Sequence, residues 1–273
     1  MNETGFVQGA LRTTVFLAAL FLSAPAECEQ VLATIGTTGI TDTQLAQAMA
    51  SAPYAAQFPA MDEDQQAALR GEMLIRLVDA EILRQEALAL GLDQEPDFQR
   101  EVVNYRTGLL YRKYIQSLRD TIAIPDAVDR DFKQRYTGNP DALAATRSTY
   151  VAKRFRLLKE KRFKELEKRY HVHVHADRLA SHPQGDVVLA EGDFFTLNYA
   201  DIRLSRDNPT SPESTKQEEN RLQDIVETRI AAQAALDSGI DVAQQVDSYR
   251  KELLPRALME KKEREWIPDE TVL

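Results

Sequence analysis

Apolar residues recur at every third or fourth position over two long stretches of the chain. In the first stretch, which runs from Asp62 to Leu90, they lie at Leu69, Met73, Leu77, Ala80 and Leu83. In the second, from Asp97 to about Thr121, they lie at Phe98, Val102, Tyr105, Leu109 and Tyr114. A helix places such positions on one face. We therefore expect two amphipathic helices, the first ended by Gly91 as a residue that accepts the left-handed conformation.

Shorter patterns predict the remaining elements. Val31–Ile35 is typical of a strand, and Thr41 or Asp42 can cap the helix that follows. A long basic helix ends near Tyr170, where His171–His175 alternates with valine as a strand does. The fold class is therefore mainly α with short β-strands, and we expect Val31–Ile35 to pair with His171–His175.

The same pattern occurs a second time along the chain. Val187–Gly192 repeats the first strand, and a helix from Leu222 to Leu236 stops at Gly239 as the earlier helix stops at Gly91. Further matches pair Leu77-Val78-Asp79 with Ile225-Val226-Glu227, Tyr105-Arg106 with Tyr249-Arg250, and Ile124-Pro125-Asp126 with Ile267-Pro268-Asp269. Two hairpins of similar composition are the alternative. We predict a duplication, with a first module at 27–182 and a second, partial copy at 183–273.

The first residues have the pattern of an export signal. Arg12 precedes the apolar run Val15–Leu22, which is too short to span a bilayer. Ala24 and Ala26 then form a small-x-small cleavage pattern, so residues 1–26 are expected to be a signal peptide cut before Glu27. A lipoprotein attached through Cys28 is the alternative. The predicted location is the bacterial periplasm.

Composition narrows the classes of function. The chain has 34 Lys and Arg against 43 Asp and Glu, a net charge of −9, which disfavours general nucleic-acid binding. Its single cysteine excludes an internal disulfide and a cysteine-rich zinc site. No later apolar run is long enough to cross a membrane, so we expect no transmembrane segment. A homodimer is compatible with these features.

Several motifs together resemble a known family. They are the strand of type Val-x-Ala-x-x-Gly at Val31–Gly36, the Thr-initiated helix, the segment LVDAEILRQEALALGLD at 77–93, the Tyr-rich helix and the Ile-Pro-Asp helix start. This order is similar to the N-terminal chaperone module of SurA-like and PrsA-like periplasmic foldases, in the PpiC/parvulin-type peptidyl-prolyl isomerase family. The likeness covers Val31 to about Arg135 and again Val187–Leu273.

The chain departs from that family at one place. In members of the family, a parvulin domain normally lies between the Ile-Pro-Asp helix and the closing helix. In this chain, Asp131 leads through a short loop into the basic helix. The Gly-Gly loop and the histidine-led strand of a parvulin are absent, and all four histidines lie between 171 and 182. The resemblance therefore implies a chaperone module without the isomerase domain.

Two charged features have competing interpretations. The segment from Thr146 to Tyr170 carries a net charge of +7, which leaves −16 on the rest of the chain. It is either a solvated face packed on an acidic body or a patch that steers acidic polypeptides or an anionic membrane. His171, His173 and His175 point to one side of a strand, yet three residues in line do not easily reach one ion. We predict no metal site and no cofactor.

Aromatic residues are the candidate binding surface. Phe98, Tyr105, Tyr111 and Tyr114 follow one helix and could line a cradle for unfolded chains, because tyrosine combines apolar area with a polar tip. Alternatively, the same residues hold two helices together. No nucleophile lies beside a base in the sequence pattern, so no catalytic residue is predicted.

These features predict an ATP-independent, chaperone-like protein that binds unfolded or partly folded exported polypeptides. Two alternatives stay open. One is a parvulin-type prolyl isomerase whose domain is lost or unrecognised. The other is a dedicated assembly factor or metal-carrying periplasmic protein that uses the histidine strand.

Overall fold

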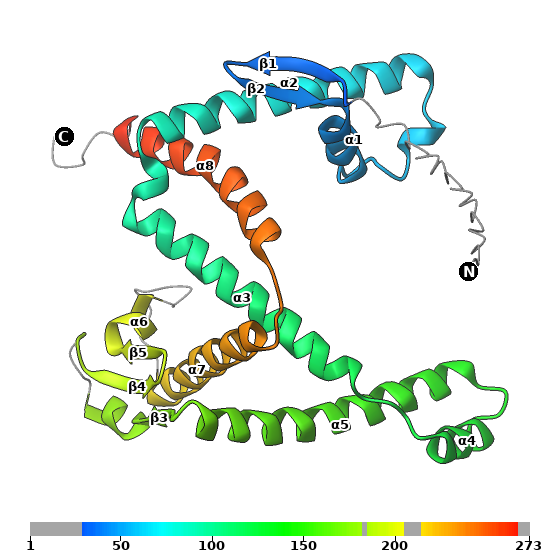
Figure 1. Ribbon diagram of the computed structural model, residues 1–273. Coiled ribbons are helices and arrows are strands. Elements are labelled where there is room, and N and C mark those ends of the chain that lie inside the picture. Colours follow the sequence, from blue (N-terminus) through cyan, green and yellow to red (C-terminus); the bar gives the residue numbers. More distant parts are fainter. Residues whose placement is uncertain (1–28, 182–184, 205–213, 267–273) are drawn as a thin grey trace, which may run out of the picture. The chain divides into compact units, whose positions relative to one another are not determined.

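The computed structural model describes residues 29–181, 185–204 and 214–266 (Figure 1). These residues are mainly helical with a few short antiparallel strands, which confirms the predicted fold class. They form two compact units, one ending at Asp79 and the other beginning at Ala80. Within the described part of the chain, every helix is too short or too polar to cross a bilayer. The predicted signal peptide at 1–26, including Ala24 and Ala26, lies outside it.

The first unit contains a β-hairpin, a short helix and the start of a long one. β1 (Val31–Ile35) pairs antiparallel with β2 (Thr38–Thr41) across a turn in which Gly36 has φ of 58°. α1 (Asp42–Ala50) follows without a loop because Thr41 and Gln44 form a capping box at its start. A short 3-10 helix, Phe58–Ala60, leads to α2 (Glu63–Ala89), which continues into the second unit.

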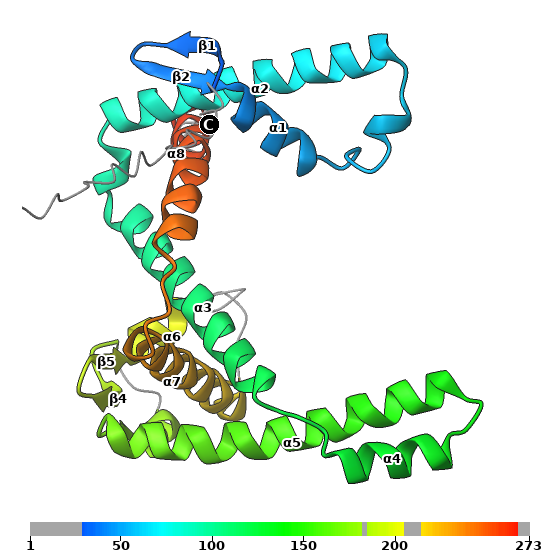
Figure 2. The ribbon, with the colours of Figure 1, turned by 45° about the vertical axis from the view of Figure 1, so that its right-hand side comes forward.

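The second unit is built around long helices. The remainder of α2 stops at Gly91, and the unit then contains α3 (Pro96–Asp120), α4 (Asp126–Arg135), α5 (Pro140–Arg169), α6 (Tyr199–Leu204), α7 (Thr215–Asp237) and α8 (Ala243–Trp266). The larger core lies where α7 packs against α3, α5 and α6. Both views show α4 and the first half of α5 extending away from this core as a hairpin (Figures 1 and 2).

A small sheet covers one end of that core. β3 (His173–Val174), β4 (Val188–Gly192) and β5 (Phe195–Asn198) form three antiparallel strands, with β4 in the middle. The predicted pairing of Val31–Ile35 with His171–His175 is therefore wrong, because β1 pairs with β2 and β3 pairs with β4. β1 and β3 thus each pair with a strand other than the one that the sequence predicted.

Two core clusters in the second unit contain residues that the sequence matches with one another. α7 packs closely on α3, whereas the end of α2 joins a smaller cluster with residues of α3 and α8. Residues that the sequence matches occupy matching places: Ala231 and Ala235 meet Leu110 and Tyr114 in one cluster, and Leu83 and Ala87 meet Leu254 and Leu258 in the other. The rings of Tyr105 and Tyr249, matched with each other by the sequence, stack with centroids 3.8 Å apart.

The compact units do not coincide with the modules delimited in the sequence at 27–182 and 183–273. α7 and α8 belong to the second module, yet they share their cores with α3 and the end of α2 from the first. Helices on either side of residue 182 therefore share cores, whereas the β1–β2 hairpin, α1 and α2 up to Asp79 belong to the first compact unit.

Candidate functional site

An apolar groove in the first unit is the strongest candidate for a binding site. It has a volume of about 530 Å³. Its lining consists of Leu32 from β1, Asp42, Leu45, Ala46, Met49 and Ala50 from α1, Ala55 and Phe58 from the following loop, and Arg70 from α2. Pockets that bind small ligands typically measure roughly 300–1,000 Å³. The groove can therefore accommodate apolar side chains of a bound segment.

Local sequence signals build this groove. The Thr41 capping box fixes where α1 begins, so that Leu45 and Met49 lie one turn apart on the same face. Met49 is buried, and its sulfur accepts a hydrogen bond from the Tyr54 hydroxyl at 3.7 Å. The Arg70 guanidinium lies 5.1 Å from the centroid of the Phe58 ring, a cation–π contact between two residues that line the groove.

The lining is suited to binding rather than to covalent chemistry. Apolar side chains form most of it, with the Asp42 carboxylate and the Arg70 guanidinium as the charged groups. No serine, cysteine or histidine belongs to the residues that line it. Methionine adapts to partners of different shape because its side chain is unbranched and flexible. The arrangement can hold apolar groups of varied shape, with a charge of each sign available for backbone or side-chain contacts.

The aromatic residues predicted from the sequence lie elsewhere, in the second unit. Phe98 and Tyr114 are only 5% and 3% exposed, and each belongs to a core cluster. The Tyr114 hydroxyl accepts a hydrogen bond from Arg162 Nε at 3.1 Å. Tyr105 stacks on Tyr249, while Tyr111 is half-buried against the larger core. The four residues hold helices together, and Phe98 and Tyr114 offer almost no accessible surface to a polypeptide.

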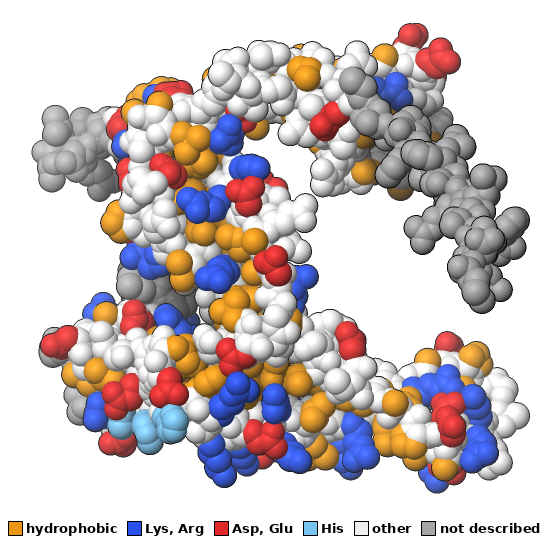
Figure 3. Space-filling view, in the orientation of Figure 1, with side chains coloured by type: hydrophobic (Ala, Val, Ile, Leu, Met, Phe, Trp, Pro, Cys, Tyr) orange, Lys and Arg blue, Asp and Glu red, His pale blue; other side chains and the backbone are white. Residues whose placement is uncertain are grey.

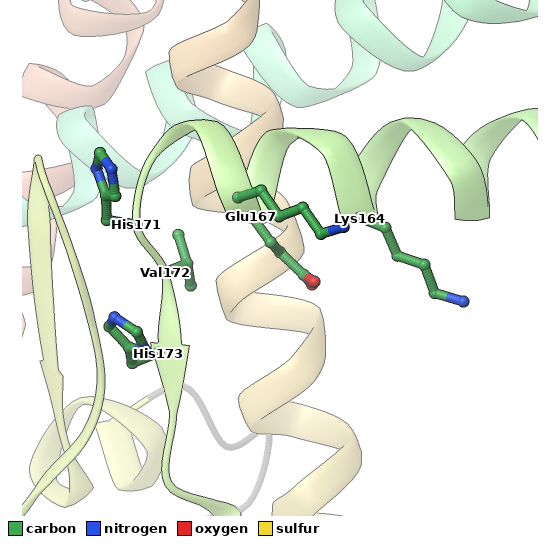
Figure 4. Close-up of a pocket in the computed structure, with 6 residues that line it drawn as sticks. Lys164, Glu167, His171, Val172 and His173 are labelled. Atoms are coloured by element: carbon green, nitrogen blue, oxygen red, sulfur yellow. The ribbon is translucent and has the colours of Figure 1, made fainter.

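His171 and His173 border a second hollow, of about 400 Å³, at the end of α5 (Figure 4). Lys164, Glu167 and Lys168 from the helix line it together with His171, Val172 and His173. The imidazole of His171 lies 3.0 Å from the carboxylate of Asp193, and that of His175 lies 3.5 Å from Glu191. Among the described residues, no three His, Cys, Asp or Glu side chains are placed to hold a metal ion.

His171 ends α5 in an unusual backbone conformation. Its φ is 49°, the one positive value at a non-glycine position in the described chain. The N–H of Val172 donates to the carbonyl of Glu167 at 2.9 Å, and that of His171 to Lys168 at 3.4 Å. This pair of bonds is a Schellman motif, in which glycine usually occupies the place of His171. His171 therefore lies outside β3, so the predicted line of three strand histidines does not form.

Charged groups join α5 to α7. Lys159 Nζ lies 2.7 Å from Glu227 Oε2. Burial lowers the pKa of Lys159, but the hydrogen bond and charge of Glu227 outweigh it, and the pKa is raised. Burial, with the nearby Glu227 charge, raises the pKa of Glu167. Further along, the Tyr170 hydroxyl donates to Asp237 at 2.8 Å, and burial together with this bond raises the pKa of Tyr170 to about 12.

The basic helix is only partly neutralised by these contacts. Arg147 pairs with Asp129, Lys164 with Glu160 and Arg169 with Asp237. Lys153, Arg154, Arg156 and Lys168 are exposed, and Figure 3 shows basic side chains along α5. The helix is therefore bound to the acidic α7 along its second half and presents positive charge to solvent elsewhere.

The sequence analysis missed the groove of the first unit, although one of its signals was present. Thr41, Gln44, Leu45 and Met49 together mark a capped helix with an apolar face. The strand Thr38–Thr41 is too short and polar to predict, so nothing placed β1 beside that face.

Searches of protein-family models, of curated proteins and of solved structures found no match for this chain.

Proposed function

We propose that this protein is a periplasmic, ATP-independent chaperone-like protein that reversibly binds unfolded or partly folded exported polypeptides. The observation that carries the proposal is the apolar groove of the first unit, with its adaptable Met49 and Phe58. The export-signal pattern at residues 1–26 supports a location outside the cytoplasm. The resemblance of the sequence motifs to SurA-like chaperone modules supports the same function.

The groove changes where binding is proposed to occur. Exposed apolar surface is what a chaperone needs, and Phe98 and Tyr114 are buried. Leu32, Leu45 and Phe58 instead line an open groove on the first unit. A net charge of −9 keeps complexes with apolar clients in solution. Binding here would be reversible, because the groove offers contacts to side chains without requiring one sequence.

Aggregation of an unfolded outer-membrane protein, followed by light scattering without ATP, tests the proposal. The purified mature chain should suppress aggregation at stoichiometric ratios. Ala46→Glu places a carboxylate in the groove from an exposed position and should weaken client binding about tenfold, about 1.4 kcal/mol. Gln47→Glu adds the same charge to the same helix outside the lining, and should bind clients as the parent does.

Two results would contradict the proposal. Equal loss of suppression in both variants would show that charge on α1, and not the groove, controls binding. Acceleration of proline-limited refolding at catalytic concentrations would instead favour the isomerase alternative, since the uncatalysed rotation barrier is roughly 18–20 kcal/mol.

A further inference from the structure

The groove of the first unit contains a positive charge that no carboxylate of the described chain neutralises. Among the residues that line it, Arg70 supplies the guanidinium and Asp42 the carboxylate. Oδ1 of Asp42 accepts hydrogen bonds from the backbone N–H groups of Thr43 at 2.7 Å and Gln30 at 3.2 Å. Arg70, in contrast, forms no ion pair with any carboxylate of the described residues. The groove can therefore offer this guanidinium to an anionic group of a ligand.

Two neighbours hold the Arg70 side chain while most of its donors stay available. Its Nη2 donates to Oε1 of Gln66 at 3.3 Å, and its guanidinium lies 5.1 Å from the centroid of the Phe58 ring. Gln66 is itself held, because its Nε2 donates to the carbonyl of Met61 at 3.0 Å. A guanidinium carries five N–H donors in a planar fork, which matches the two oxygens of a carboxylate. Arg70 is therefore positioned to bind a carboxylate at an apolar groove.

We propose that this groove binds the C-terminal end of an unfolded polypeptide whose last residue is apolar, with Arg70 donating to the terminal carboxylate. In a C-terminal residue, the carboxylate and the side chain are bonded to the same carbon, so both can contact one small site. Arg70 and the ring of Phe58 offer the complementary pair, a cation and an apolar surface 5.1 Å apart. Leu45 and Met49 supply further apolar lining for the preceding side chain.

A chain end suits this groove better than an internal acidic residue does. The side chain of an internal Asp or Glu ends in its carboxylate, so it can satisfy Arg70 but brings no apolar group of its own to the lining. A chain end can also enter a groove of about 530 Å³ without a second stretch of chain having to leave it. The inference rests on the proposed function, because it names the part of a client that the same groove binds.

The test compares the affinities of two peptides for the purified mature chain by fluorescence polarisation at about 0.1 M salt. Both have the sequence Gly-Ser-Gly-Ser-Val-Leu with fluorescein at the amino end, and they differ only in a free or an amidated C-terminus. We expect the free acid to bind at least about tenfold tighter, because hydrogen bonds between charged groups are stronger than neutral ones. Higher salt should reduce this advantage, since Arg70 is exposed.

Variants of two arginines on α2 identify the cation. Arg70→Gln should lower the affinity for the free acid to that for the amide and leave the affinity for the amide unchanged. Arg76→Gln is the matched control, because Arg76 is already paired with Glu72 and does not line the groove. It should keep the full difference between the peptides. Ala46→Glu should weaken the binding of both peptides, since both use the apolar lining.

Several outcomes would overturn the inference. Equal affinity for the two peptides, with both lost in Ala46→Glu, would leave the proposed function standing and remove the role of the chain end. No binding of either peptide would contradict both proposals. A difference that persists in Arg70→Gln would place the carboxylate at another cation. Equally tight binding of a labelled, amidated Gly-Ser-Gly-Ser-Val-Leu-Glu would show that any carboxylate suffices. Displacement of the free acid by a lower concentration of dodecanoate, lost in Arg70→Gln, would make a fatty acid the ligand.

Discussion

At the scale of single residues, His171 occupies a position that normally belongs to glycine. It is the C′ residue of α5, and its φ of 49° lies in the left-handed region, where a side chain crowds the backbone. Its one ionic contact, with Asp193, joins two exposed side chains, and such contacts contribute little to stability. The backbone strain at His171 is therefore not offset by a strong side-chain interaction.

Replacing His171 by glycine should stabilise the protein. We expect His171→Gly to raise the free energy of unfolding by about 1 kcal/mol, because glycine adopts a positive φ without steric cost. Urea denaturation followed by circular dichroism measures this change. His173→Gly is the control, since His173 lies in β3 and should lose stability on the same substitution. A loss of stability in His171→Gly would show that the contact with Asp193 outweighs the strain.

At the scale of secondary-structure elements, the sequence predicted helix ends better than strand partners. The helices predicted at 62–90 and 97–121 occur at 63–89 and 96–120, because capping residues and glycines act on adjacent residues. Strand pairing depends on contacts far along the chain. Alternation at His171–His175 predicted a strand, of which only His173–Val174 forms, and it carried no information on whether β1 or β4 would be the neighbour.

The two glycine stops provide a test of equivalent elements. Gly91 and Gly239 have φ of 69° and 75°, and an added Cβ would meet nothing within 4 Å at either position. Alanine at each should lower the free energy of unfolding by about 1 kcal/mol through backbone strain alone. Gly108→Ala, at an open position inside α3, should raise it by about 0.5–1 kcal/mol. Thermal or urea unfolding of the three variants measures the difference, and a neutral Gly91→Ala together with a neutral Gly239→Ala would refute the equivalence.

At the scale of the whole molecule, the two units differ in how much they bury. In the described residues up to Asp79, Ile40 and Met49 are the buried apolar side chains. α7 alone buries seven apolar side chains, from Leu222 to Ala235. Composition showed that the chain could form a core, but not where, because the core joins helices from both ends of the sequence. The groove escaped prediction for the same reason, since β1, α1 and the Phe58 loop meet only in three dimensions.

This difference predicts unequal local stability. Amide hydrogens of β1, β2 and α1 should exchange through openings of lower free energy than those of α3 and α7, because few buried apolar contacts oppose their opening. Hydrogen exchange with mass spectrometry under native conditions, read by peptide, makes the comparison. Amides in the middle of α7 serve as the internal reference for global unfolding. Equal protection of α1 and α7 would show that the first unit is held by contacts other than its own core.

The stack of Tyr105 on Tyr249 places each ring against the tyrosine that the sequence matches with it, with the planes only 4° from parallel. A residue that meets its own equivalent is the hallmark of an isologous interface, the kind that joins identical subunits about a dyad. Here one chain supplies both partners. Covalent linkage makes their association intramolecular, with an effective concentration set by the intervening chain. Dilution therefore cannot separate the two halves, as it would separate a homodimer built from one such hairpin.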